Sequence, residues 1–151
     1  MGDALEASLA VFAAEWVTRA EFKAAYPDDM TATDFVNKLF DTAALAPYTT
    51  ERQQQIQAMT LSGKTRAQVI RDAIEMEEFR NKEYNPSFVL MQYFGYLKRD
   101  QDLGGYNFWL NVLNNSEPNN YRGMVCAFIT SAEYQLRFSS TITHSNRDCA
   151  P

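Results

Sequence analysis

An acidic residue followed by an aromatic one recurs along this chain at a nearly constant interval. The three copies are Glu21-Phe22, Glu78-Phe79 and Glu133-Tyr134, so their aromatic members lie 57 and 55 positions apart. Apolar residues stand five and six positions before each aromatic, and Phe35-Val36 is matched by Phe88-Val89 at an interval of 53. Such an interval indicates repeated structural units that cover one another's apolar faces. We therefore expect about two helical repeats preceded by half of a third.

The spacing of apolar residues in the first segment is that of an α-helix. They recur three, four or one positions apart, at Leu5, Leu9, Phe12, Ala13, Trp16, Val17 and Ala20. This stripe predicts one amphipathic helix that begins at Asp3 and ends just before Pro27.

Capping motifs mark the start of two later helices. Thr31 has an acid three residues later at Asp34, and Thr65 has Gln68 at the same distance, which is the spacing of a capping box. We expect the helix behind Thr65 to continue toward residue 83. A mostly polar helix is expected over about 50–61, where Gly63 would end it.

The run 88–97, FVLMQYFGYL, is apolar on almost all sides. Its composition also permits a buried strand, but no neighbouring segment alternates with a period of 2, so a strand would lack a partner. A helix that is apolar all round belongs at the centre of a bundle. We predict that this helix begins with Asn85 as N-cap and Pro86 at the first helical position.

Together these patterns predict an all-α fold, a bundle of about six or seven helices. With 151 residues, the chain is long enough for one domain with a real core, which we place at 1–138. Residues 139–151 show no periodicity and are expected to form a flexible tail.

Composition excludes several classes of protein. The net charge of −5 disfavours a nucleic-acid partner, because binding to phosphates needs clustered Lys and Arg. No apolar run reaches about 18 residues, so we expect no membrane span. One His and two Cys cannot form a structural zinc site. Cys126 lies in an apolar helical run and Cys149 near the end of the chain, and we expect no disulfide between them.

The loop 100–105 has the Asp and Gly positions that open a calcium-binding loop. Positions 5 and 12 of such a loop would be Gly104 and Asn111, so too few carboxylates remain to hold Ca²⁺. The favoured interpretation is that Asp102 caps the following helix while Arg99 bonds back to it. The one His, His144, lies in the predicted tail and cannot serve a catalytic triad. We expect no enzyme activity, no metal and no cofactor.

The segment RDQDLGGYNFWLNVL resembles the Leu-Gly-Arg-x-Pro-Asp-x-x-Gly-x-x-x-Trp signature of a bacterial helical domain-of-unknown-function family, numbered four-two-one-four. The signature positions are held by Leu97, Arg99, Asp102, Gly105 and Trp109, to which the resemblance assigns structural roles. Lys98 and Gln101 stand where the family has Gly and Pro. The pieces TTERQQQI and TRAQVI resemble a degenerate first repeat, in which the signature Arg, Gly and Trp are absent.

The resemblance covers roughly residues 11–138 and is greatest to acidobacterial secreted members, with a distant similarity to phycobilisome linker domains. It implies an extracellular or cell-surface location. With the incomplete first repeat, it also implies a longer gene product that carries a secretion signal.

Two functions from different classes are compatible with these observations. The leading hypothesis is a non-catalytic protein-interaction or spacer module, whose partners are upstream domains of the same chain or a surface protein. The alternative is a module that binds a carbohydrate or another small ligand on exposed aromatic side chains, with Tyr93, Tyr96 and Tyr106 as candidates.

Overall fold

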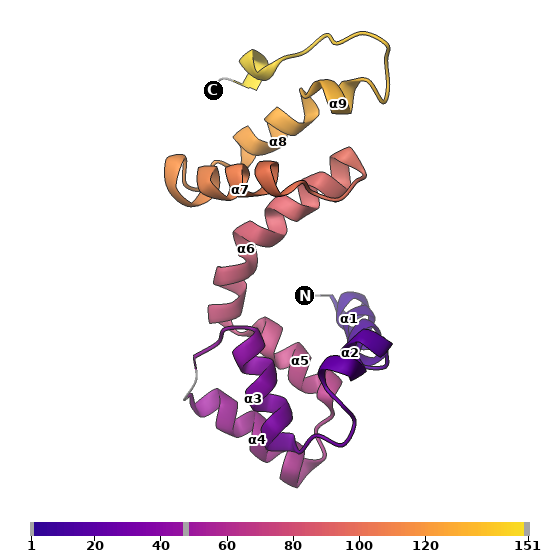
Figure 1. The fold of residues 1–151 in the computed structure, drawn as a ribbon, viewed down its shortest axis with the longest axis vertical. Helices are drawn as coiled ribbons and strands as arrows, with labels where there is room; N and C mark the ends of the chain where they lie inside the picture. Colours follow the sequence, from indigo (N-terminus) through magenta and orange to yellow (C-terminus); the bar gives the residue numbers. More distant parts are fainter. Residues whose placement is uncertain (1, 47–48, 150–151) are drawn as a thin grey trace. The chain divides into compact units, whose positions relative to one another are not determined.

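The computed structural model describes residues 2–46 and 49–149, and within these ranges every regular element is a helix. The prediction of an all-α fold is therefore confirmed. The chain divides into two compact units, residues 1–80 and 81–151, and each unit is described by itself (Figure 1). The single domain expected over 1–138 stays a prediction. No helix in the described ranges has both the length and the apolar character needed to cross a bilayer.

The first unit is built from five complete helices and the start of a sixth. They are α1 (Asp3–Trp16), α2 (Ala20–Ala25), α3 (Ala32–Thr42), α4 (Thr50–Ser62), α5 (Arg66–Glu75) and α6 (Glu77–Gln92), which continues into the second unit. Helix α1 packs against α5, and α3 packs against both α4 and α5. The core contains Phe22, Tyr26, Phe35, Val36, Phe40, Leu45, Val69 and Ala73.

The predicted caps of this unit are present. The Thr31 hydroxyl accepts a hydrogen bond from the Asp34 amide at 3.1 Å and begins α3. Thr65 and Gln68 form a reciprocal capping box at the start of α5. Helix α4 ends at Gly63, whose φ of +68° is accessible to glycine at little cost.

Two predicted continuous helices are interrupted, which corrects the sequence-based boundaries. The helix expected from Asp3 to Pro27 breaks at Thr18 and Arg19, and the one expected from 66 toward 83 breaks at Met76. Arg19 and Met76 have extended backbones, with ψ of 146° and 134°, so the next helix starts in a new direction. Phe22 is thereby buried, with its ring stacked 4.8 Å from Tyr26.

The predicted N-cap at Asn85 is wrong, because α6 runs through this position with Pro86 inside the helix. The Asn85 side chain makes other contacts. Its amide nitrogen donates to Asn114 Oδ1 at 2.6 Å, and its oxygen accepts from the Tyr121 hydroxyl at 2.7 Å. These bonds fix α6 to the loop before α8, and α6 then ends in a π-helical turn, η1 (Tyr93–Leu97).

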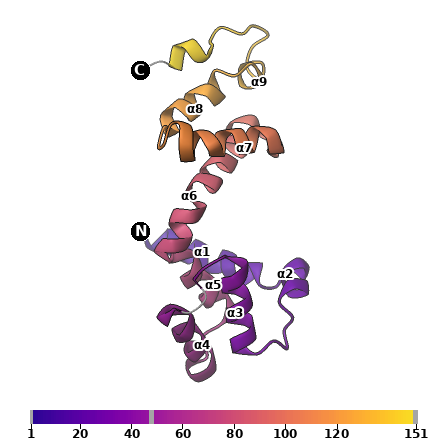
Figure 2. The ribbon, with the colours of Figure 1, turned by 60° about the vertical axis from the view of Figure 1, so that its left-hand side comes forward.

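The second unit continues with shorter helices. They are α7 (Leu103–Asn111), the π-helical turn η2 (Val112–Ser116), α8 (Tyr121–Ile129), α9 (Ala132–Gln135) and the 3₁₀ turn η3 (Asn146–Cys149) (Figure 2). Its core is formed by Val89, Tyr93, Leu97, Leu113, Met124 and Phe128. The last predicted helix is also interrupted, since Ser131 has an extended backbone and caps α9 by accepting from the Tyr134 amide.

Candidate functional site

The family-like signature forms a loop that is locked to the start of α7. Asp102 caps this helix, with its carboxylate accepting from the Gly105 amide at 2.7 Å. Arg99 Nη1 donates to the Asp100 carbonyl at 2.9 Å and lies 3.5 Å from the Asp102 carboxylate. The Gly105 amide, together with Arg99, lowers the pKa of Asp102 below its ordinary value. The predicted cap and back-bond are therefore both present.

Arg99 also joins this loop to α9 through a bidentate ion pair. Its Nε and Nη2 donate to the two carboxylate oxygens of Glu133 at 2.7 and 3.1 Å. Hydrogen bonding to Arg99 lowers the pKa of Glu133, and the same bond raises the pKa of Arg99. The guanidinium further lies 5.1 Å from the centre of the Tyr93 ring, within the range of a cation–π contact.

Gly105 of α7 lies close to Tyr93 of η1. A Cβ atom placed there would lie 2.2 Å from the Tyr93 hydroxyl and 3.1 Å from the Asp102 carboxylate. Tyr93 is only 3% exposed, so it has little freedom to withdraw. Burial, and then the charge of Asp102, raise the pKa of its phenol. The signature glycine thus makes room for a buried tyrosine.

The other two signature residues pack in the core of the second unit. Leu97 is buried, and its carbonyl accepts a hydrogen bond from Arg137. Trp109 is half-buried, with its ring 5.7 Å from that of Phe128. Both residues hold α7 and α8 against the end of α6.

The three tyrosines expected on a ligand surface do not share one environment. Tyr93 is buried, whereas Tyr96 and Tyr106 are half-buried, and the Tyr96 ring packs edge-on against Tyr134 at 5.8 Å. The more exposed rings nearby are Phe94 and Phe108, which the sequence argument did not select. Periodicity alone did not separate these rings, which cluster on η1 and α7.

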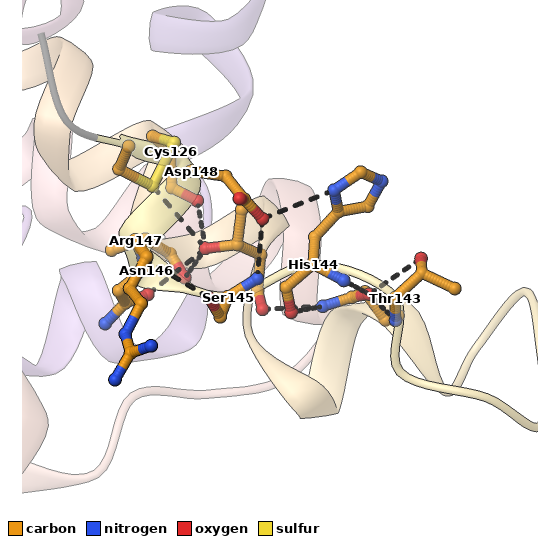
Figure 3. A network of polar contacts seen from close by, with 11 residues as sticks. Cys126, Thr143, His144, Ser145, Asn146, Arg147 and Asp148 are labelled. Carbon is orange, nitrogen blue, oxygen red and sulfur yellow. Dashed lines mark hydrogen bonds and ion pairs between the residues drawn. A yellow bond between two sulfur atoms is a disulfide. The ribbon is translucent and has the colours of Figure 1, made fainter.

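The segment after α9 folds back over the second unit, with residues 143–148 shown in Figure 3. The buried side chain of Gln135 in α9 holds part of it. Its amide nitrogen donates to the carbonyls of Thr130 and His144 at 2.6 and 2.9 Å. Its oxygen accepts from the amides of Thr143 and His144, both at 2.9 Å. Three of these four hydrogen bonds hold residues 143–144, and the fourth joins Gln135 to Thr130 at the end of α8. The last two residues of the predicted tail, 150 and 151, lie outside the described ranges.

The expectation of no disulfide is wrong, because Cys126 of α8 is bonded to Cys149 of η3. The Thr130 hydroxyl contacts Asn146 Oδ1 at 3.1 Å, and Asp148 accepts from the Ser145 amide at 2.8 Å, so the turn lies against α8 (Figure 3). The Cα atoms of the two cysteines are then 5.6 Å apart, within reach of a disulfide. Sequence reasoning missed the pair because it treated 139–151 as loose chain.

The signature loop, α8, α9 and the returning segment line an open pocket of about 440 Å³. Its lining includes Tyr93, Leu97, Arg99, Trp109, Phe128, Glu133, Ile142 and His144. Most of this surface is apolar, and its main charged groups, Arg99 and Glu133, are already paired with each other. No group of three or more His, Cys, Asp or Glu in the described ranges could hold a metal ion. The arrangement suits packing or an apolar ligand better than acid–base chemistry.

The repeated acids make comparable contacts in two of their three copies. Glu133 binds Arg99, which lies 34 residues earlier. Glu78 accepts a hydrogen bond at 3.0 Å from the amide of Ala46, which lies 32 residues earlier. Each acid is the second residue of its helix, α6 for Glu78 and α9 for Glu133. Each bonds to a loop earlier in the chain, which follows α3 for Glu78 and η1 for Glu133. The acid thus joins one helix pair to the next.

Comparison with known proteins places part of the chain in a family. Residues 70–138 match the model of a family described as a domain of unknown function (DUF4214). No curated protein and no solved structure matches the chain.

Proposed function

Residues 70–138 of this chain belong to the DUF4214 family, and we propose that the chain is a non-catalytic protein-interaction or spacer module of a secreted or surface-attached bacterial protein. In this proposal the module acts by packing helices against other helices. It carries out no reaction and needs no cofactor.

The observation that carries the proposal is how the charged signature residues are used. Arg99 donates hydrogen bonds to Glu133, Asp102 and the loop backbone. The Asp102 carboxylate accepts a hydrogen bond from the Gly105 amide. These bonds join the signature loop to α7 and α9. A set of polar residues committed to inter-helix contacts supports a structural role.

The secreted location draws support from the Cys126–Cys149 disulfide. Disulfides form and persist in oxidising compartments and are rare in the reducing cytosol. The bond also fastens η3 to α8, which suits a module exposed to proteases.

The partner in this proposal is protein, because apolar side chains are exposed on the outside of the first unit. Leu5, Phe12 and Trp16 of α1 are between 41% and 53% exposed. Contiguous exposed apolar surface on a folded protein commonly marks an interaction site.

A second candidate function is favoured by the pocket in the second unit. Its aromatic lining, with Tyr93, Trp109 and Phe128, would accept a small ligand with an apolar face, such as a sugar ring. In this candidate the ligand lies in an open pocket lined by these rings.

Thermal unfolding with a panel of glycans, Ca²⁺ and small apolar compounds separates the two functions. A ligand present at 100 times its Kd would add about 2.7 kcal/mol to the free energy of unfolding. The interaction-module proposal expects no saturable shift with any of them. A saturable shift with one glycan that disappears in Trp109→Leu would overturn it. A matched Phe108→Leu variant, whose ring is exposed beside Trp109, controls for general destabilisation.

A further inference from the structure

We propose that the exposed face of α1 and α2 binds a helix pair of the same type as residues 81–116, placed directly ahead of α1 in a longer polypeptide. The inference rests on the proposed function and names the partner. It follows from comparing the three copies of the repeated acid–aromatic pair.

The three copies share one backbone geometry. The residue two positions before each acid is extended, with ψ of 146° at Arg19, 134° at Met76 and 146° at Ser131. Each time, a helix ends before this residue and another begins directly after it. Residues at equal distances from the aromatic member are therefore structurally equivalent, and their surroundings can be compared.

The equivalent apolar positions differ sharply in burial. In the second copy, Val69 and Ala73 stand ten and six positions before the aromatic and are 0% and 4% exposed; in the third, Met124 and Phe128 are 1% and 4% exposed. In the first copy the same positions hold Phe12 and Trp16, which are 53% and 41% exposed. At these two positions the first copy thus has exposed aromatic rings, whereas the second and third copies have buried side chains.

The structure also identifies what covers the buried copies. Val69 and Ala73 share a core with Phe35, Val36 and Phe40 of α3. Met124 and Phe128 share a core with Val89 and Tyr93, the third copy's equivalents of Val36 and Phe40 at an interval of 53. In both cases the covering residues belong to the helix pair that directly precedes the covered helix in the chain. The loop 63–65 joins α4 to α5, and the loop 117–120 joins η2 to α8.

The polar contacts of the three acids also set the first copy apart from the other two. Glu78 and Glu133 each accept hydrogen bonds from the loop of the covering helix pair, at Ala46 and Arg99. In the described part of the chain, the Glu21 carboxylate makes no hydrogen bond or ion pair. The guanidinium of Arg19 instead lies 4.8 Å from the Trp16 ring and pairs with Glu15.

The required partner can therefore be specified. It is a helix with apolar residues placed as Val89 and Tyr93 are, followed by a loop that directs a backbone amide or an arginine at Glu21. The helix pair 81–116 of this chain carries both features and serves as the probe.

The test uses the full chain with a second copy of residues 81–116 fused ahead of residue 1 by a flexible Gly/Ser linker of about 12 residues. Hydrogen exchange followed by mass spectrometry reports on residues 9–22. We expect amide exchange in α1 to slow at least tenfold relative to the chain without the extension. The protection should be lost in Phe12→Ser/Trp16→Ser and reduced by Glu21→Gln or by Arg99→Leu in the added copy.

Val11→Ser is the matched control, because Val11 is exposed on the same helix but is equivalent to Gly123 rather than to a core position. It should leave the protection intact. Exchange in residues 121–135 should not change, which shows that the added pair has not displaced the native one.

Unchanged exchange in α1 would overturn the inference, as would protection that survives Phe12→Ser/Trp16→Ser. Concentration-dependent protection of α1 in the chain without the extension would overturn it in favour of a second copy of the chain as occupant. These outcomes differ from failure of the proposed function, which would show as a saturable ligand shift in the thermal screen.

Discussion

Tyr93 and Gly105 form a matched pair whose counterparts in the first unit are Phe40 and Arg52, each at an interval of 53. In the second unit the glycine leaves room for the tyrosine hydroxyl. In the first unit Phe40 has no hydroxyl, and Arg52 stands in place of the glycine with its guanidinium 5.2 Å from the Phe40 ring. Each ring is therefore in cation–π contact with an arginine, Arg52 in the first unit and Arg99 in the second. An arginine thus lies against the ring at this position in both units, although Arg52 and Gly105 differ.

At the residue scale, Gly105→Ala should destabilise the second unit by about 1–3 kcal/mol, the usual cost of overpacking a core. The added methyl group meets the Tyr93 hydroxyl, and removing that hydroxyl should relieve the strain. In urea denaturation, Gly105→Ala should cost at least about 1 kcal/mol less in a Tyr93→Phe background than in the native one. Gly95→Ala is the control, because a Cβ there meets no atom within 4 Å. Additive effects of Gly105→Ala and Tyr93→Phe would contradict the close approach.

At the scale of helices, local motifs were predictable and long-range ones were not. The caps at Thr31, Thr65 and Asp102 depend on side chains within three residues, so the sequence alone located them. The breaks at Arg19 and Met76 contain neither Gly nor Pro, and tertiary packing of the next helix determines them. Asn85-Pro86 has the form of a helix start, yet contacts with Tyr121 and Asn114 hold it inside α6.

In the candidate site, too, local features were predictable from the sequence and long-range contacts were not. The sequence indicated Arg99 and Asp102 because a family signature contains them. Glu133 lies 34 residues from Arg99, and the signature carries no sign of their pairing. Gln135 and the disulfide escaped prediction because both act through residues that are distant in sequence and have no periodic pattern.

The ion pair between the signature loop and α9 should make stability depend on pH. The pKa values of Glu133 and Asp102 are lowered in the folded chain, whereas in the unfolded chain they stand near 4. Their stabilising effect is therefore complete above about pH 5 and is lost as the pH falls through the folded-state values. We expect the Tm of the second unit to fall on acidification from pH 6 to pH 3, and to fall less steeply in Glu133→Gln. Both side chains are well exposed, so the effect should be modest and weakened by salt.

The control is Glu77→Gln, an exposed acid in the first unit. It should leave the pH dependence of the second unit unchanged. Equal slopes for the native chain and Glu133→Gln would show that the pair contributes nothing to stability.

The segment after α9 should be released by Gln135→Ala. This change removes two donor and two acceptor contacts at once and leaves the backbone groups of residues 143–144 without their partners. Hydrogen exchange in residues 141–147 should accelerate at least tenfold, while the disulfide still holds Cys149. Gln101→Ala, on an exposed loop residue, should have no such effect. Unchanged exchange would mean that the disulfide alone positions the segment.

At the scale of the whole molecule, the two units have separate cores, and the disulfide lies entirely within the second one. The chain has two tryptophans, Trp16 in the first unit and Trp109 in the second. Trp109→Phe and Trp16→Phe variants therefore report on one unit each by fluorescence. Removing the disulfide with Cys126→Ser/Cys149→Ser should lower the free energy of unfolding seen by Trp109 by about 3 kcal/mol, the value for a loop of this size.

The response of Trp16 decides how the units are coupled. If the units unfold independently, the urea midpoint seen by Trp16 should stay where it is when the disulfide is removed. If both tryptophans report the same shift, the chain unfolds in one cooperative transition, as the predicted single domain over 1–138 requires. We expect independent transitions, because each unit buries its own apolar cluster and closes its own polar contacts, Glu78 with Ala46 in one and Glu133 with Arg99 in the other. A module made of such units can be lengthened by adding helix pairs without redesigning its core, which is the property that a spacer needs.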